Sequence, residues 1–254
     1  MSITQKLGRI PLIQGTLEAL QDLLFPPYCL GCQRRLDHSR PPLLCADCCQ
    51  ALSFITPPYC LGCGLPFAGG SSHLCGLCLQ HHYAFDRACS ALAYTPPVSS
   101  LLLALKFSGQ TTVVATLAAL VRESGACTLL HPPDLILPVP LHRLRLRERG
   151  FNQAMLLSRH CFPQWRNRIA PELLQRVRAT RPQSQLSGRQ RRSNLKGSFQ
   201  LKSSSALRGK HLLLVDDVFT SGSTVNECAK TLRRAKPAAI EVFTLSRSLD
   251  KGQS

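Results

Sequence analysis

The sequence predicts an α/β protein in which a parallel sheet is flanked by helices and preceded by a small cysteine-rich module. Two short apolar runs, residues 134–141 and 212–215, are each followed by a helical pattern, as expected of buried parallel strands with their crossover helices. Eight of the 13 cysteines form C-x-x-C pairs within residues 29–78. With 254 residues, 44% of them hydrophobic, the chain can build one ordinary domain and a smaller companion.

We expect three segments: a helical leader over residues 1–25, the cysteine-rich module over 26–80 and the α/β domain over 81–254. Within the leader, residues 10–24 carry Ile and Leu at helical spacing, which is typical of a short helix packed on a domain. The chain has no run of 18 apolar residues and no secretory signal pattern. We therefore expect a cytoplasmic protein without membrane insertion.

The cysteines of the module form two sets at zinc-binding spacing. The first set is C-x2-C-x12-C-x2-C and the second is C-x2-C-x11-C-x2-C. Residues 26–32 and 57–63 are both PPYCLGC, so the two sets are copies of one unit. Four thiolates from two tight turns suit a tetrahedral Zn²⁺ ion. We expect two structural zinc sites, with the ligands Cys29, Cys32, Cys45 and Cys48 in one and Cys60, Cys63, Cys75 and Cys78 in the other.

The spacing leaves alternatives to this ligand assignment. The ligands could be interleaved between the copies, the C-x-x-C pairs could be redox active, and nearby side chains could replace a cysteine. Local sets are favoured because each copy is complete by itself. Four sulfur ligands leave no open coordination position, so the metal would fold the module rather than catalyse a reaction. The candidate substitutes are His73, His81, His82 and Cys49.

The other elements are predicted from hydrophobic periodicity. A strand and two helices follow the module, and each of the two apolar runs then precedes a helix. Between residue 141 and the next helix lies an arginine-rich segment, which we expect to be a loop. The predicted strands are 88–94, 134–141 and 212–215, and the predicted helices are 98–107, 111–121, 152–161 and 223–235.

The residues after the strand at 212–215 have the composition of a site for a phosphorylated sugar. Asp216 and Asp217 come first, and the turn FTSGST follows at residues 219–224. In a parallel sheet the carboxyl edge forms the ligand crevice, and the start of the next helix favours a phosphate. Adjacent carboxylates can accept hydrogen bonds from ribose hydroxyls and hold Mg²⁺, while Gly222 permits a positive φ. A plain helix cap is the alternative, but capping alone does not require two carboxylates and four hydroxyls.

Positive charge is concentrated in one part of the chain. The formal net charge is +17, and residues 142–210 hold 17 Lys and Arg against two Glu, a net charge of +15. One small phosphate ligand does not need so many cations, so we expect a polyanion such as single-stranded DNA as a partner. A solvated basic face is the alternative. The aromatic residues available for base stacking are Phe151, Phe162, Trp165 and Phe199.

Residues 212–225 resemble the loop that binds phosphoribosyl diphosphate (PRPP) in type I phosphoribosyltransferases, and the chain has no Walker A pattern. The resemblance implies that Asp216 and Asp217 contact the ribose hydroxyls and that residues 220–224 hold the 5′-phosphate. Ser221 stands where relatives have Thr and keeps the hydroxyl, and we expect Phe219 to pack beneath the turn. The PRPP-binding residues so implied are Asp216, Asp217, Val218, Thr220, Ser221, Gly222, Ser223 and Thr224.

Several motifs also follow one another in a specific order: the cysteine pairs, Leu105-Lys106-Phe107 before Gly109, PVPL at 138–141, RGFNQA at 149–154, Arg191 with Asn194, and the Asp-Asp turn. This order, over about residues 26–248, resembles the ComF competence family, which includes DNA-utilisation proteins. The resemblance implies a double zinc ribbon fused to a phosphoribosyltransferase-like domain. It also implies a role in natural transformation or DNA uptake, with competence-machinery proteins as partners.

Two basic segments complete the implied site. Arginine forks after the strand at 134–141 match diphosphate oxygens, and the resemblance makes this segment the diphosphate loop. A mobile segment over 181–194 is implied to cover the crevice. The loop residues are Pro140, Leu141, His142, Arg143, Arg145, Arg147 and Arg149, and the mobile residues are Arg181, Gln183, Arg189, Arg191, Arg192 and Asn194.

Three functional hypotheses follow from these residues. The first is a DNA-uptake protein that binds a phosphoribosyl ligand and single-stranded DNA. The second is an Mg²⁺-dependent phosphoribosyltransferase, with Asp216 and Asp217 as catalytic residues and an unidentified acceptor. In the third, the zinc ribbons are a docking surface for a partner protein.

Overall fold

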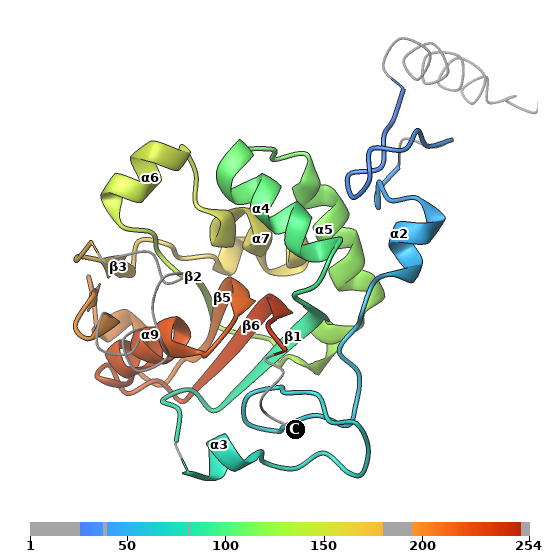
Figure 1. The fold of residues 1–254 in the computed structure, drawn as a ribbon. Helices are drawn as coiled ribbons and strands as arrows, with labels where there is room; N and C mark the ends of the chain where they lie inside the picture. The colour runs from blue at the N-terminus through green and yellow to red at the C-terminus, as the bar shows by residue number, and fades with distance from the viewer. Residues whose placement is uncertain (1–25, 38–39, 81, 180–194, 250–254) are drawn as a thin grey trace, which may run out of the picture.

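The structure is a computed structural model that describes residues 26–37, 40–80, 82–179 and 195–249 of the chain. Its centre is a four-stranded parallel sheet in the order β1-β6-β5-β2 (Figure 1). The strands are β1 (Arg87–Ala93), β6 (Ala239–Arg247), β5 (His211–Phe219) and β2 (Leu135–Pro138). All four strands run in the same direction, so their carboxyl ends meet at one edge of the sheet.

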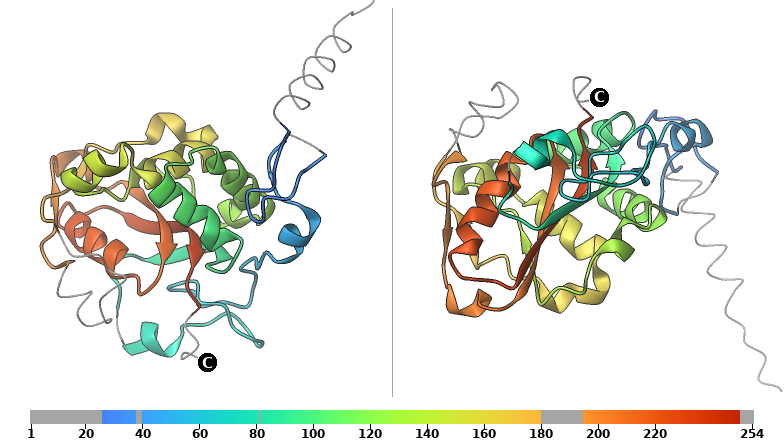
Figure 2. Two further views of the ribbon diagram at one scale, coloured as in Figure 1. Left: turned by 45° about the horizontal axis from the view of Figure 1, so that its top comes forward. Right: turned by 90° about the horizontal axis from the view of Figure 1, so that it is seen from below.

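Helices cover both faces of this sheet (Figures 1 and 2). One face carries α4 (Val98–Ser108), α5 (Val113–Glu123) and α7 (Gln153–Cys161), and the other carries α9 (Ser223–Arg233). The helix ends have local causes. Asn152 caps α7 because its side-chain oxygen accepts a hydrogen bond from the Ala154 amide at 3.0 Å, and Gly109, with φ +64°, ends α4.

The side chains of β5 divide the apolar core between the two faces. Leu213 and Val215 pack with residues of α4, α5 and α7, whereas Leu212 and Leu214 pack with residues of α9. Because successive side chains of a strand point to opposite faces, the two aspartates that follow must also diverge. The sheet therefore separates Asp216 from Asp217.

Smaller elements lie around the sheet. Strands β3 (Leu174–Arg176) and β4 (Phe199–Leu201) form an antiparallel pair, and β4 contacts α9. Helix α6 (Arg143–Arg149) follows β2, and in the described part of the chain three short 3₁₀ helices connect other elements. They are η1 (Ala126–Leu129), η2 (Pro163–Arg168) and η4 (Ser205–Leu207).

The cysteine-rich module consists of two similar units, which we name the first ribbon (residues 26–52) and the second ribbon (residues 57–80). They contain the short helices α2 (Ala46–Gln50) and α3 (Gly76–Gln80). Each has an antiparallel bridge at the equivalent place, Tyr28 with Arg35 and Tyr59 with Pro66, so the sequence repeat is also a structural repeat. The first ribbon lies beside α5 and the second lies below the strands in Figure 1.

Most predicted elements are confirmed, with two corrections. The strand predicted over 212–215 continues to Phe219, so both aspartates lie inside β5. The arginine-rich segment, expected to be a loop, forms α6, which begins at His142 and ends at Gly150 with φ +79°. The leader, the substitute ligand His81 and the whole segment predicted to be mobile, 181–194, lie outside the described residues. In the part of the chain that is described, no helix is long and apolar enough to cross a membrane.

Candidate functional site

Each ribbon brings its own four cysteines together, so the interleaved alternative is wrong. The four sulfur atoms of each set lie within 4.8 Å of one another. Cys32 Sγ and Cys45 Sγ are 3.6 Å apart, and Cys63 Sγ and Cys75 Sγ are 3.8 Å apart. With Zn–S bonds of about 2.3 Å, two ligands of a tetrahedral zinc ion lie about 3.8 Å apart. Both sets therefore fit Zn²⁺.

In each ribbon, one cysteine has surroundings that favour its thiolate form. Cys29 Sγ accepts a hydrogen bond from the Cys45 amide at 3.3 Å, and Cys60 Sγ accepts one from the Cys75 amide at 3.2 Å. Although burial acts in the opposite direction, such backbone hydrogen bonds lower the pKa of each of these two thiols to about 6. His73 stacks on Phe67 with ring centroids 4.4 Å apart and belongs to neither set.

The end of β5 presents its two aspartates differently. Asp216 is partly exposed on the α9 side of the sheet, and burial together with the adjacent Asp217 raises the pKa of its carboxyl group. Asp217 is 5% exposed, and its Oδ2 lies 2.5 Å from Lys106 Nζ of α4. Burial opposes the charge of Lys106, but Asp217 and Asp216 raise its pKa, so the pair is ionic. Asp216 is the carboxylate available to a ligand, and Asp217 holds Lys106 at the same edge.

The turn after β5 is shaped by glycine and an aromatic ring. Gly222 has φ +68° and precedes the first residue of α9, and no side chain caps this helix. A Cβ atom at Gly222 would lie 2.5 Å from Cζ of Phe219, so the ring packs directly beneath the turn, as the sequence predicts. The hydroxyls of Ser221 and Ser223 lie 2.8 Å apart, and Thr220 is exposed. An uncapped helix start with hydroxyls beside it is a suitable anion site.

Two of the four arginines of helix α6 face the carboxyl edge of the sheet. Arg145 and Arg149 are four residues apart and therefore share one helix face, whereas Arg143 and Arg147 are exposed. Arg149 Nη1 donates to Gln153 Oε1 at 2.6 Å. Burial lowers the pKa of Arg149, and the carboxylate of Asp217 opposes this effect. Helical periodicity thus decides which arginines face the site.

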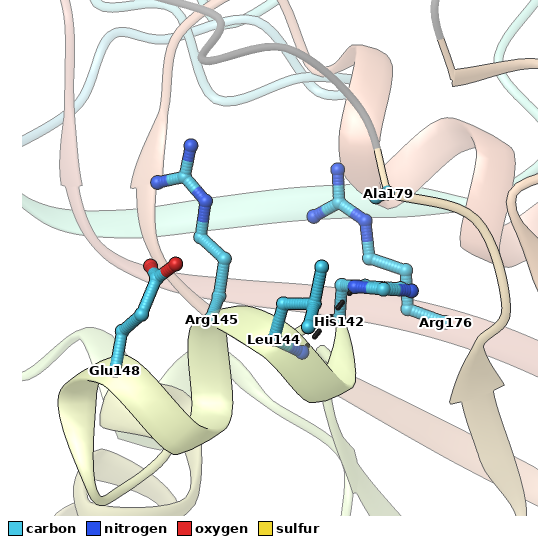
Figure 3. Close-up of a pocket in the computed structure, with 6 residues that line it drawn as sticks. All are labelled: His142, Leu144, Arg145, Glu148, Arg176 and Ala179. Carbon is cyan, nitrogen blue, oxygen red and sulfur yellow. Dashed lines mark hydrogen bonds between the residues drawn. The ribbon is translucent and has the colours of Figure 1, made fainter.

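Arg176 of β3 reaches the same place from a distant part of the chain. Burial lowers its pKa, with the nearby charges of Asp216 and Arg145 acting in opposite directions. Figure 3 shows Arg145 and Arg176 on two sides of a cavity of about 130 Å³. Its lining consists of His142, Leu144, Arg145, Glu148, Arg176 and Ala179. This cavity is small and of mixed polarity, and its two guanidinium groups suit phosphate oxygens.

Sequence reasoning missed Lys106, Arg176 and one further residue, Arg247, as parts of this region. Lys106 belongs to a motif that the family resemblance contains, which was a usable signal. Arg176 is one of many arginines in the basic segment, and no local pattern distinguishes it. Two of the four aromatic side chains proposed for base stacking, Phe162 and Phe199, are buried and cannot stack on a base. Phe107, 75% exposed and adjacent to Lys106, is available instead.

Two family models match the chain. Residues 20–79 match the double zinc ribbon domain, and residues 161–254 match the phosphoribosyl transferase domain. These matches agree with the paired cysteine sets and with the parallel sheet flanked by helices.

The chain is also similar to curated proteins and to solved structures. It is 41% identical to the DNA utilization protein YhgH of Escherichia coli K12, over 73% of this chain and 82% of that protein. It is 38% identical to competence protein F of Haemophilus influenzae, over 68% of this chain and 78% of that protein. A hypoxanthine phosphoribosyltransferase from Staphylococcus aureus gives a TM-score of 0.35 at 15% identity, covering 57% of this chain and 68% of that one. On the two family models and the two curated relatives, the chain belongs to the ComF family of competence and DNA-utilisation proteins.

Proposed function

We propose that the protein acts in DNA uptake or utilisation, and that it binds a phosphoribosyl ligand at the carboxyl edge of its sheet. The names of the relatives support the first part. The observation that carries the second part is the convergence of an uncapped turn and a group of cations at one sheet edge. Gly222 and its neighbouring hydroxyls supply the turn, and Lys106, Arg145, Arg149 and Arg176 supply the cations.

The ligand would occupy this edge in three parts. Its 5′-phosphate would lie at the turn, where backbone amides at the helix start and the Ser221 and Ser223 hydroxyls can donate. Asp216 would accept hydrogen bonds from the ribose hydroxyls and would help to hold Mg²⁺. A diphosphate group would enter the cavity between Arg145 and Arg176, because one guanidinium group can donate two parallel hydrogen bonds to phosphate oxygens.

Single-stranded DNA would follow the basic face next to this edge. Within the described part of the basic segment, many arginines and lysines are exposed, including Arg143, Arg147, Arg159 and Arg178. Phe107 offers an exposed aromatic ring close to Lys106. Proteins that bind single strands combine two features: cations along the sugar-phosphate backbone, and aromatic rings on which the bases stack.

Calorimetric titration with PRPP and Mg²⁺ tests the ligand. Wild-type protein is expected to bind, and Arg176→Met is expected to weaken binding by about tenfold or more, the loss typical of one charge-assisted hydrogen bond to phosphate. Arg208→Met, an exposed arginine of the same segment, is the matched control and should keep the wild-type affinity. Absence of binding by folded wild-type protein would exclude the phosphoribosyl ligand.

A competition assay then relates the two partners. A labelled oligonucleotide should bind with an affinity that falls steeply with salt, because binding releases counterions from the strand. PRPP should displace the oligonucleotide if both occupy one crevice. Release of diphosphate from PRPP in the presence of candidate bases would favour the second candidate function, phosphoribosyl transfer, which the arginine-lined cavity supports.

A further inference from the structure

Arg247, the last residue of β6, joins the second ribbon to the turn at residues 219–224, which we name the phosphate turn. Although it is only 4% exposed, its guanidinium group contacts two different parts of the molecule. Nη1 donates to the Cys63 carbonyl oxygen at 2.6 Å, and Nη2 lies 3.6 Å from Cys63 Sγ. The same group lies over the ring of Phe219, with Cζ 4.5 Å from the ring centroid. One buried side chain therefore touches a zinc ligand and the floor of the turn.

The charge of Arg247 requires a partner of opposite charge. A buried cation is costly unless an anion or several acceptors compensate it. Among the described residues, no carboxylate forms an ion pair with Arg247. The anionic group within reach is the second cysteine set, which carries net negative charge when four thiolates bind Zn²⁺. Zn²⁺ would hold these four sulfur atoms as thiolates, and their excess negative charge would compensate the charge of Arg247.

Phe219 transmits this position to the turn. Its ring lies where a Cβ atom of residue 222 would be, so the turn rests on the ring without a gap. Tyr83 and Phe85, which follow the second ribbon, contact the same ring edge-on, each with a centroid distance of 6.3 Å. The Tyr83 hydroxyl also donates to the Ser221 carbonyl oxygen at 3.4 Å. Arg247 and these two rings hold Phe219 from several sides.

We propose that Arg247 and the second zinc centre brace the phosphate turn, so that zinc in this centre sets the affinity of the turn for a phosphate monoester. The ligand named here rests on the proposed function, whereas the brace concerns the order of the turn itself. Arg247 is a positioning residue, because it acts on the ligand through Phe219. The first ribbon has no such connection, since its described contacts are with the start of α4 and with α5.

The first test compares two arginine variants of the zinc-loaded full-length protein in their affinity for ribose 5-phosphate. Arg247→Met removes the charge and keeps an unbranched side chain that covers part of the same space. Arg34→Met is the matched control, because Arg34 forms an exposed ion pair with Asp47 in the first ribbon. The affinity of Arg247→Met should fall by about tenfold or more, as expected for a lost charge-assisted contact, while the control stays at the wild-type value. Equal affinities of the two variants would overturn the brace.

The second test uses wild-type protein and stepwise removal of zinc by a chelator. Cys32 of the first ribbon is exposed, whereas all four ligands of the second ribbon are buried, so the first centre should lose its metal first. Ribose 5-phosphate affinity should persist through the first loss and fall with the second. Affinity that follows the first zinc, or neither, would contradict the proposal.

Hydrogen exchange of residues 219–226 separates this inference from the proposed function. Loss of the second zinc, or Arg247→Met, should speed exchange in this segment without any ligand present. If wild-type protein binds neither PRPP nor ribose 5-phosphate but exchange still responds, the proposed function fails and the brace stands. If the ligand binds and exchange does not respond, the brace fails alone.

Discussion

The first and second ribbons contain the same PPYCLGC segment and the same kind of ligand set, but they pack against different parts of the sheet domain. The first ribbon contacts the helical layer, where the Leu43 amide donates to Thr116 Oγ1 of α5 at 2.9 Å. The second ribbon contacts the strands themselves, where the Ala88 amide of β1 donates to the Gly62 carbonyl oxygen at 2.9 Å. The two copies of the motif therefore contact different layers of the sheet domain.

The environments of the two metal centres differ accordingly. Cys32 is exposed in the first ribbon, whereas the four cysteines of the second ribbon are buried beside Arg247. The segment after the second ribbon also contacts α9, where the Ala84 amide donates a hydrogen bond to Asn226 Oδ1 at 2.7 Å. The comparison teaches that a repeated metal module takes its role from the surface on which it docks.

The largest expected effect comes from removing one ligand of each centre. Cys75→Ser and Cys32→Ser should each reduce the zinc content from two ions per chain to one. Because structural zinc contributes directly to folding, Cys75→Ser should also lower the melting temperature and the affinity for ribose 5-phosphate by about tenfold or more. Cys32→Ser should leave that affinity within about twofold. Metal analysis, thermal melting and calorimetry measure the three quantities, and equal affinities would remove the distinction between the ribbons.

A second comparison uses one glycine in the phosphate turn and one glycine in the first ribbon. Gly222→Ala places a Cβ against Phe219 at a φ of +68° and should lower the free energy of unfolding by about 1–3 kcal/mol, with loss of phosphate affinity. Gly31→Ala places a Cβ 2.9 Å from Cys48 Sγ and should disturb zinc binding in the first ribbon only. Denaturant unfolding and calorimetry check both variants. Phosphate binding that fails in Gly31→Ala would contradict the separation.

A matched pair of hydrogen-bond acceptors gives a smaller effect. Thr116→Val and Asn226→Ala each remove the side-chain oxygen that accepts a backbone amide from, respectively, the first ribbon and the segment after the second. Each should cost about 1 kcal/mol of unfolding free energy, the usual value of one such bond. Only Asn226→Ala should speed hydrogen exchange in residues 219–226. Faster exchange in Thr116→Val would mean that both ribbons act on the turn.

The smallest effect concerns pH and belongs to the sheet edge rather than to either ribbon. The pKa of Asp216 is raised by burial and by Asp217, so the folded protein keeps a proton that the unfolded chain loses near pH 4. The free energy of unfolding should therefore fall as pH rises from about 4 to the raised folded value. Asp216→Asn should abolish this decline and be more stable at pH 8, by about 1 kcal/mol for a partly exposed group. Denaturant unfolding at several pH values measures it, and parallel curves would disprove the assignment.

Much of the architecture could be predicted from local sequence. The strand and helix around the Asp-Asp turn and the helices at α4, α5 and α7 follow from periodicity, and the eight paired cysteines follow from spacing, whereas the structure decided that each set is local. The prediction that Phe219 packs beneath the turn was also correct. The sequence interpretation contained no strand at β6, although this strand is central and carries Arg247. The arginine-rich segment was predicted as a loop from its alternating arginines after a strand, but it forms α6, in which Leu144 and Leu146 are exposed.

The sequence alone singled out the eight paired cysteines and the residues of the turn after β5, because both depend on short spacings within one segment. Only the tertiary structure decided that Asp217 pairs with Lys106, that Arg176 faces Arg145 across a cavity, and that Arg247 joins Cys63 to Phe219. These partners are separated by tens of residues or more. Their meeting is set by the order of strands in the sheet and by the face on which each helix packs, which no local pattern encodes.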